Sequence, residues 1–340
     1  MADTGKKKLF VEARAKELLV AVADRLDPPL TIESVVRVDA ENEDAAALEI
    51  KSLAELKSGS YAFANVGIYP DGGFIRPHTV DSLGRAKAAN FVDKTLSEAL
   101  SIVPEDKLTA VLNPLTGALF DPSGTPSKTL LFVGGREESI RQKQRQLSGM
   151  AIFPERLELT NLAALGLAVK NLRIQNREGP ELVVNFGESE TQTWVISEVG
   201  IQAFRLIKKG YADLYPIVQR ELGLRDTASA EHMLKTKAFD VKSIGTLLTQ
   251  EMINEFLTMI GFYEVQFGQT ITRLTPIGIE ANFSWIGEAV ASGLGMEVLG
   301  NDLADSIQSH GVTLAPSVDL GPDPLIYFNL LSLAAQASLS

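Results

Sequence analysis

The amino-acid sequence predicts an α/β fold built from two similar halves. Short apolar runs of strand length alternate with longer segments in which apolar residues recur at helical spacing. A strand-turn-strand pattern near Glu12 returns near Asn185, about half of the chain further on. The chain has 340 residues, 45% of them hydrophobic, which is enough for one large or two ordinary globular domains.

The composition excludes several classes of function. The net charge of −11 argues against nucleic-acid binding and against direct attraction to anionic lipid, because both need clustered lysine and arginine. The absence of cysteine rules out disulfides, thiol nucleophiles and cysteine-based metal or iron-sulfur sites. We predict no metal site at the three histidines, because none has the spacing of a ligand pair: His78, His232 and His310. Partners are expected to be proteins or small molecules.

The sequence favours a cytoplasmic location. Lys6, Lys7 and Lys8 precede apolar residues as in a secretory signal, but Glu12 and Arg14 interrupt what would have to be an unbroken apolar stretch. No segment approaches the roughly 18 continuous apolar residues that span a bilayer. We therefore expect no direct membrane insertion, and any membrane association would come through a partner.

In the first half, residues 8–24 predict a strand, a polar turn and a second strand. A helix is predicted at 82–101, where apolar residues recur at helical spacing. A second helix is predicted at 136–149, where acidic residues come early and basic residues late, as the helix dipole favours. Further apolar runs of strand length lie at 61–68, 107–112 and 128–133.

The second half begins with a hairpin at 181–197 that continues to Leu206. A helix follows at 209–222, and Gly223 ends it. A longer helix is predicted at 243–267, and we interpret its apolar stripe as core packing. The residues of this stripe are Leu248, Met252, Phe256, Met259, Ile260, Tyr263 and Phe267.

Four segments together resemble the actin-like ATPases, and within them the family of the type IV pilus assembly protein PilM, a relative of the division protein FtsA. Residues 128–159 resemble the family's strand, loop, helix and strand, and 181–223 resemble its second phosphate hairpin with the segment that follows. Residues 252–268, MINEFLTMIGFYEVQFG, are similar to its long helix and are the most specific piece. Residues 271–302 resemble the strand, glycine loop, helix and strand that close its nucleotide site.

The resemblance implies an actin-like, ribonuclease H-like fold of two duplicated lobes with a small inserted subdomain. The first lobe would comprise residues 1–175, including the inserted subdomain at about 52–130. The second would comprise 176–340, with a C-terminal helix at about 323–337 that returns to the first lobe.

The resemblance also locates a nucleotide cleft. Actin-like ATPases hold ATP and Mg²⁺ with two glycine-containing hairpin turns, each carrying an Asp-x-Gly pattern, and with a glycine-rich loop on the adenine side. Here the first turn reads Glu12-Ala13-Arg14 and the second reads Asn185-Phe186-Gly187. Thr191 helps to preserve the shape of the second turn, and the adenine-side loop retains one glycine, Gly278.

These departures all weaken nucleotide binding. The first turn has lost its glycine and the second its charge, while Glu188 and Glu190 would repel phosphate. We therefore predict a degenerate site with impaired or absent ATP hydrolysis, in which ATP and Mg²⁺ are not favoured. The alternative is a working ATPase in which Glu12 serves the magnesium ion and Arg14 neutralises phosphate.

For function, the resemblance implies assembly rather than turnover. PilM-like proteins lie at the cytoplasmic face of the inner membrane and bind the N-terminal peptide of a membrane-anchored partner, PilN. We expect a PilN-like partner here, together with other pilus or secretion assembly proteins. Two alternatives stay open at this point: an FtsA-like filament former and a cytoplasmic component of a type II secretion system.

Overall fold

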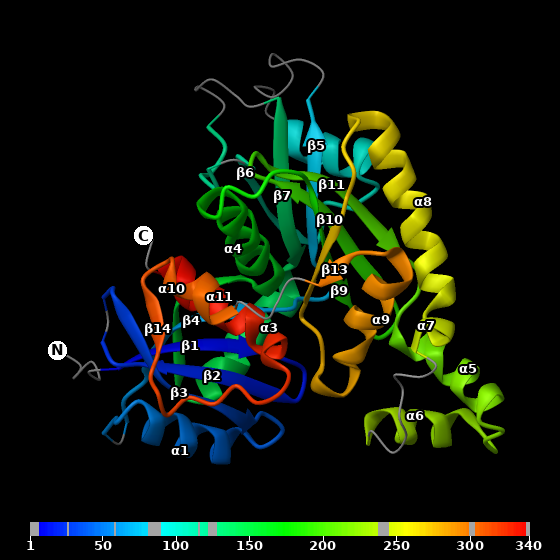
Figure 1. The fold of residues 1–340 in the computed structure, drawn as a ribbon. Coiled ribbons are helices and arrows are strands. Elements are labelled where there is room, and N and C mark those ends of the chain that lie inside the picture. The colour runs from blue at the N-terminus through cyan, green and yellow to red at the C-terminus, as the bar shows by residue number, and fades with distance from the viewer. Residues whose placement is uncertain are drawn as a thin grey trace. The chain divides into compact units, whose positions relative to one another are not determined.

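Three β-sheets organise the part of the chain that the structure describes (Figure 1). This computed structural model describes residues 7–25, 27–57, 59–80, 90–114, 116–121, 128–236, 245–298 and 303–337. The sheets belong to two compact units. Unit 1 comprises Met1–Leu167, Ala304–Asp319 and Asn329–Ser340, and unit 2 comprises Ala168–Leu303 and Leu320–Phe328.

Unit 1 is built on a six-stranded sheet with the order β14-β3-β2-β1-β4-β8. Strands β1, β2 and β3 form an antiparallel meander, whereas β4 is parallel to β1, β8 to β4 and β14 to β3. The strands are β1 (Lys8–Ala13), β2 (Glu17–Ala23), β3 (Leu30–Asp39), β4 (Ala62–Ile68), β8 (Ile152–Leu159) and β14 (Val312–Leu314). The predicted strands at 8–24 and 61–68 are confirmed.

Helices cover this sheet because its strands are apolar on both faces. Alternate residues of β4, such as Ala64 and Val66, pack with α1 and α3 in one core. On the opposite face, a side chain added at Gly67 would meet Leu333 of α11, so this helix lies against the strand there. The helices are α1 (Glu43–Leu53), α3 (Glu137–Gly149), α4 (Thr160–Ile174), α10 (Leu303–Gln308) and α11 (Phe328–Ala337).

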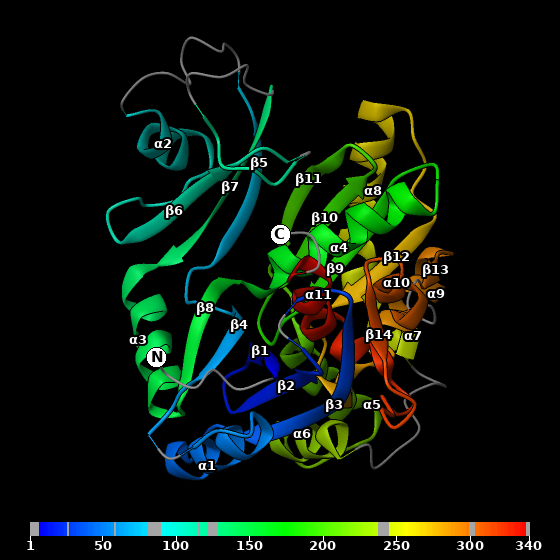
Figure 2. The same cartoon turned by 90° about the vertical axis from the view of Figure 1, so that its left-hand side faces the viewer.

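A three-stranded sheet is inserted into unit 1 between β4 and β8. Figure 2 shows this sheet with α2 next to it. It has a small core of its own around Phe132 and Leu96. Its elements are β5 (Phe74–Thr79), α2 (Phe91–Lys94), the π-helix η2 (Thr95–Ala99), β6 (Lys107–Leu112) and β7 (Thr129–Arg136). The predicted insertion at 52–130 differs at both ends, because β4 pairs within the large sheet and β7 runs to Arg136.

Unit 2 repeats the strand order of unit 1. Its sheet runs β11-β10-β9-β12-β13, with β9, β10 and β11 antiparallel and β12 parallel to β9. This order corresponds to β3-β2-β1-β4-β8, so the duplication predicted from the sequence is confirmed. The strands are β9 (Glu181–Phe186), β10 (Thr191–Ser197), β11 (Gly200–Ile207), β12 (Arg273–Ile277) and β13 (Glu297–Val298).

One core joins the helices of unit 2 to its sheet, with Val184 and Leu274 from the strands and Phe256 from α8 at its centre. Phe267 does not belong to it: the predicted stripe is wrong at this residue, which is 43% exposed and stacks on Tyr263 at the helix end. The helices are η3 (Tyr211–Asp213), α5 (Leu214–Glu221), α6 (Thr227–Lys235), α7 (Gly245–Leu248), α8 (Gln250–Phe267), η4 (Ala281–Phe283), α9 (Trp285–Leu294) and η5 (Pro324–Tyr327).

Some predicted elements extend beyond the described residues. The predicted helix at 82–101 has its first part outside them, and the described part is a short α-turn followed by a π-helix. The predicted helix at 243–267 begins with two residues outside them and then forms α7 and α8. Within the described residues, no helix has both the length and the apolar character that crossing a membrane requires.

Candidate functional site

The candidate site of unit 1 lies where three parallel strands end. β1, β4 and β8 run in the same direction, and their registers place Ala13, Ile68 and Leu159 side by side. The residues that follow these strands therefore meet at one edge of the sheet, which is where open α/β sheets bind their ligands. Arg14 follows β1, Tyr69 follows β4, and α4 begins with Thr160 and Asn161 after β8.

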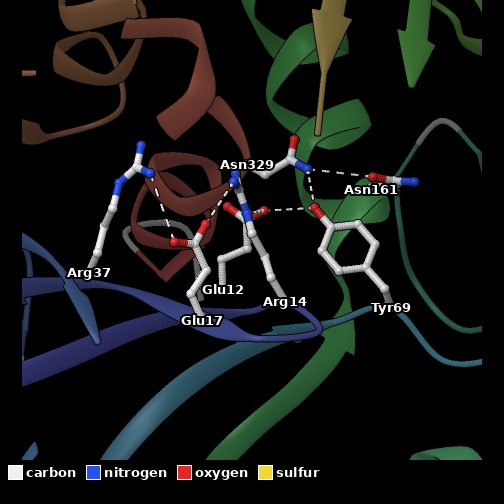
Figure 3. Close-up of polar contacts among 7 residues, drawn as sticks. All are labelled: Glu12, Arg14, Glu17, Arg37, Tyr69, Asn161 and Asn329. Carbon is white, nitrogen blue, oxygen red and sulfur yellow. Dashed lines mark hydrogen bonds and ion pairs between the residues drawn. The ribbon is translucent and has the colours of Figure 1, made fainter. Parts of the chain in front are cut away.

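Glu12 is the centre of this edge (Figure 3). Its side chain is fully buried. Its Oε1 atom accepts a hydrogen bond from Arg14 Nε at 3.0 Å and another from the Tyr69 hydroxyl at 2.7 Å. A guanidinium thus lies directly against the carboxylate that a working ATPase would need for magnesium, and it supplies the compensating positive charge.

Two further groups extend this network from either side. Asn329 of α11 donates from Nδ2 to the Tyr69 hydroxyl at 2.7 Å and lies 3.5 Å from Asn161 Oδ1. On the other side, Arg14 also pairs with Glu17 Oε1 at 3.3 Å. The result is a continuous chain of polar contacts from the turn after β1 to the C-terminal helix (Figure 3).

Burial and charge shift the pKa values of two members of this network. Burial, together with the negative charge of Glu12, raises the pKa of the Tyr69 phenol well above its ordinary value, so Tyr69 stays a hydrogen-bond donor. Burial alone would lower the pKa of Arg14, but the charge and hydrogen bond of Glu12, together with Tyr69 and Glu17, outweigh burial and hold the pKa above its ordinary value. Arg14 therefore stays protonated and keeps its positive charge in the ion pair with Glu12.

Three buried oxygen atoms of this edge have no hydrogen-bond partner among the described residues: Glu12 Oε2, Thr160 Oγ1 and Asn329 Oδ1. The carboxylate and amide oxygens only accept hydrogen bonds, so they are suited to a donor such as water. Phosphate oxygens are also acceptors. Glu12 Oε2 and Asn329 Oδ1 therefore do not provide the donors that a nucleotide phosphate needs, and only the Thr160 hydroxyl among these three groups can donate.

The second predicted turn lies in unit 2 and has the same construction as the first. Glu12 and Asn185 are each the fifth residue of a six-residue strand. The turns that follow are closed by matching backbone hydrogen bonds of 3.0 Å, from the Arg14 amide to Glu17 and from the Gly187 amide to Glu190. The correspondence of Glu12 with Asn185, and of Arg14 with Gly187, holds in the structure.

The remaining predicted residues of unit 2 gather around this turn. Asn185 pairs with Ile277 in the parallel register, which brings Gly278, at a φ of +62°, beside the end of β9. Thr191 is fully buried, and its hydroxyl donates to the Lys209 carbonyl at 2.8 Å. The four unit 2 residues predicted from sequence are therefore brought together at one edge of one sheet: Asn185, Gly187, Thr191 and Gly278.

The turn is also tied to the segment that follows β11. The carbonyls of Gly187 and Glu188 accept hydrogen bonds from the amides of Tyr211 and Ala212, at 3.0 and 2.9 Å. The Tyr211 ring stacks on Phe283 with a centroid distance of 4.2 Å, and its hydroxyl donates to a Glu280 oxygen at 3.0 Å. Tyr211 therefore spans from the hairpin turn to the loop that contains Gly278.

Sequence reasoning missed Tyr69, Asn161, Asn329, Tyr211 and Glu280. One signal was available for two of them: Tyr69 directly follows the apolar run at 61–68, and Asn161 follows the run that ends at Leu159. Residues at the ends of parallel strands meet at one edge, but the sequence does not show which strands are parallel neighbours. Asn329 and Tyr211 carried no such signal.

The residues of each turn fit Mg²⁺-ATP poorly. In unit 1, Arg14 takes the cation's place beside Glu12, and a divalent ion there would be repelled by the guanidinium. In unit 2, the Gly187 amide donates to Glu190, and Asn185 has no charge to offer a hydrated ion. Among the described residues, no group of three or more histidine, aspartate and glutamate side chains is placed to hold a metal ion.

Comparison with known proteins identifies the fold. No protein-family model matches the chain, and a search of curated proteins finds no match. Among solved structures, a chain of the "PilM-PilN type IV pilus biogenesis complex" is 16% identical, with a TM-score of 0.69 and an alignment that covers 97% of this chain and 98% of that one.

Two further solved structures are similar at lower TM-scores. A Bacteroides thetaiotaomicron protein with an actin-like ATPase fold is 8% identical over 99% of both chains, with a TM-score of 0.46. The cytoplasmic domain of EpsL, an inner-membrane component of the Vibrio cholerae type II secretion system, is 12% identical over 97% of this chain and 95% of that one, with a TM-score of 0.45. The repeated strand order and the full-length match to the PilM-PilN structure agree, and the chain therefore has the actin-like α/β fold of PilM-type proteins.

Proposed function

We propose that this chain is a scaffold of a type IV pilus or a related secretion machine, that it binds the N-terminal peptide of a PilN-like inner-membrane protein, and that it does not hydrolyse ATP. In this proposal the chain lies on the cytoplasmic side and reaches the membrane through that partner. Support for the assembly role comes from the fold shared with a chain of the PilM-PilN complex over almost its full length.

The observation that carries the loss of ATP hydrolysis is the contact between Arg14 and Glu12. The carboxylate is fully buried, and Arg14 and Tyr69 share one of its oxygens. Releasing it for a hydrated magnesium ion would leave the guanidinium without its closest partner and bring two cations together. The negative charge of Glu188 on the second turn adds repulsion toward a triphosphate, whereas Glu190 is compensated by Lys208 at 3.2 Å.

Calorimetric titration and thermal shift with Mg²⁺-ATP and Mg²⁺-ADP test this part. We expect no saturable heat and no saturable rise in Tm up to millimolar nucleotide, because only a ligand that binds the folded state raises Tm. A rise that saturates at micromolar nucleotide, or magnesium-dependent phosphate release, would contradict the proposal. A matched variant that restores the Asp-x-Gly pattern, E12D/R14G/N185D, is expected to gain nucleotide binding if these three departures removed it.

The partner is tested separately by fluorescence anisotropy with the N-terminal peptide of a PilN-like membrane protein encoded beside this chain. We expect saturable binding, and a scrambled peptide of the same composition is the control. Equal affinity for both peptides, or no binding to either, would argue against the assembly role whatever the nucleotide result. The two experiments therefore separate failure of the partner from failure of the nucleotide argument.

A further inference from the structure

Helix α8 has an apolar outer face that nothing in unit 2 covers. Figure 1 shows α8 along the margin of unit 2, with α7 and α9 on its inner side. Its inner face is buried through Met252, Phe256 and Ile260. On the outer face, Leu257 is 51% exposed and Val265 is 89% exposed.

The most exposed positions of the outer face are apolar or uncharged over three turns, and the partly buried Glu255 and Glu264 border it. Phe262, which neighbours Val265 on the helix surface, is 70% exposed. The exposed residues of α8 between Asn254 and Gln266 carry no charge. Large apolar side chains exposed next to one another make this face a candidate interaction surface.

Gly261 lies at the centre of this face. Leu257 lies one turn before it and Val265 one turn after it, so a large apolar side chain flanks the glycine at equal spacing on either side. A Cβ added at Gly261 would meet nothing within 4 Å, so the glycine is not required by packing within the chain. Glycine in the middle of an exposed helix costs stability, but it lets a second helix approach closely.

We propose that this face binds the same face of a second copy of the chain, as an antiparallel helix pair with its two-fold axis at Gly261. In that arrangement Leu257 of one copy lies opposite Val265 of the other, and Val265 of the first lies opposite Leu257 of the second. Both residues therefore gain an apolar neighbour. The two backbones cross at the glycines, where no side chain separates them.

The charges around the face favour a second copy over an anionic membrane. Helix α8 contains three glutamates and no lysine or arginine, whereas helices that bind lipid surfaces are rich in basic residues. Two of the glutamates are already neutralised within unit 2, because Glu251 pairs with Lys209 at 2.6 Å and Glu255 with Arg205 at 3.1 Å. The third, Glu264, accepts a hydrogen bond from the Ile271 amide at 3.3 Å, and a two-fold axis at Gly261 places it opposite Thr258. Two copies of this face therefore meet without placing one glutamate opposite another, although the chain has a net charge of −11.

The exposed apolar area of α8 limits how strongly two copies can associate through this helix. Taking roughly 100–200 Å² for each whole side chain, the exposed parts of Leu257, Phe262 and Val265 amount to about 300 Å² per copy. A stable dimer buries about 800 Å² per partner. The helix pair alone therefore forms weakly and reversibly, and it becomes populated where copies are concentrated.

Cysteine cross-linking tests the geometry directly, because the chain contains no cysteine of its own. Under mild oxidation of the full chain, G261C is expected to form disulfide dimers at least tenfold faster than L48C, a control on α1 that is 72% exposed. Mixing L257C with V265C is expected to give cross-links faster than either variant alone, because like positions are offset by about 12 Å along the antiparallel helices. Equal rates for G261C and L48C would overturn the proposal, and preferential 257–257 cross-linking would overturn the antiparallel arrangement.

Sedimentation equilibrium tests the association itself. The average mass of the unmodified chain is expected to rise toward twice the monomer mass with concentration, and V265E is expected to stay monomeric at the same concentrations. L48E is the matched control and is expected to behave like the unmodified chain. G261Q, which replaces glycine by a better helix former, is expected to fold at least as well yet lose self-association. A mass that stays monomeric at all concentrations, or V265E and G261Q that associate normally, would overturn the proposal.

Discussion

At the scale of single residues, two departures from the family pattern compensate each other. Each departure looks like a loss when it is considered alone. Glu12 is one methylene longer than the aspartate of the family pattern, and Arg14 replaces its glycine. In the structure they form an ion pair beside a fully buried carboxylate, with Tyr69 as a second donor. A buried carboxylate is costly unless it is paired and hydrogen-bonded, so each residue makes the other tolerable.

This coupling predicts a strong non-additivity between the two positions. R14M is expected to destabilise the protein by about 3 kcal/mol, because it leaves the buried Glu12 carboxylate without its cation. The double variant E12Q/R14M is expected to recover roughly 2 kcal/mol of that loss, because no unpaired charge remains. Urea unfolding of the four proteins of this cycle measures the coupling energy, and additive effects would show that the pair is not a unit.

The pKa of Tyr69 predicts a dependence of stability on alkaline pH. Y69F is expected to cost about 1–2 kcal/mol at pH 7, because Glu12 loses a hydrogen bond and Asn329 loses its acceptor. The folded protein holds the Tyr69 proton to higher pH than the unfolded chain, in which the phenol titrates near 10.0. The contribution of Tyr69 is therefore complete below about pH 10 and is lost as the pH rises beyond it.

The measurement is urea unfolding of the unmodified chain and Y69F between pH 7 and pH 11. Their difference in the free energy of unfolding should be constant up to about pH 10 and narrow above it. A difference that widens with pH would contradict the raised pKa.

At the scale of elements, the two hairpin turns have the same backbone structure but carry different side chains. The turns after β1 and β9 have the same length and the same closing hydrogen bond, and each follows a six-residue strand. A neighbouring segment packs on the second turn at close range, since a Cβ on Gly210 would lie 2.2 Å from the Glu188 carbonyl oxygen. The turn after β9 therefore depends on glycine at a residue that is far from it in sequence.

Two glycine substitutions are expected to act in opposite directions. G210A should destabilise the protein by about 2 kcal/mol, because the new methyl group meets backbone that cannot move independently. G261A should stabilise it by about 1 kcal/mol, because Gly261 lies in an exposed helix with open space around its Cα. Thermal unfolding of both variants in dilute protein measures the contrast, and similar effects on Tm would contradict it.

At the scale of the whole molecule, the chain crosses between its two units more than once. Unit 2 ends with η5, and the chain returns to unit 1 from Asn329 onward in α11. Leu330, Leu331 and Leu333 of this helix are fully buried. The C-terminal segment therefore contributes both to the core of unit 1 and, through Asn329, to its candidate site.

Truncating one of these side chains is expected to weaken unit 1 in particular. L333A should cost about 3 kcal/mol, because Leu333 is fully buried against β4 at Gly67. Hydrogen exchange should show faster exchange for amides of β1 and β4, with those of β9 and β12 little changed. L108A, at a residue 44% exposed on the inserted sheet, is a control that should leave both sets unchanged. Equal loss of protection in both units would show that they unfold together.

The sequence alone determined the features that depend on neighbouring residues. Short apolar runs and short polar turns predicted both hairpins, and the spacing of the two patterns predicted the duplication that the strand orders confirm. The helix at 136–149 was predicted almost to the residue, and its acidic first turn, Glu137 and Glu138, follows the helix dipole, although its last turn holds no basic residue. Glu12 and Asn185 lie at equivalent positions near the ends of β1 and β9, and Gly187 lies in the turn that follows β9; the sequence aligned the two hairpins in this way because a hairpin is a local structure.

Only the tertiary structure decided what those residues contact. Tyr69 reaches Glu12 across 57 positions of sequence, and Asn329 reaches Tyr69 across 260. These contacts depend on β4 pairing in parallel with β1 and on α11 returning to unit 1, and neither follows from local pattern. The same holds for α8, whose apolar residues look alike in sequence but divide into a buried and an exposed set. Periodicity specifies that a helix has an apolar side, whereas burial depends on which other elements pack against it.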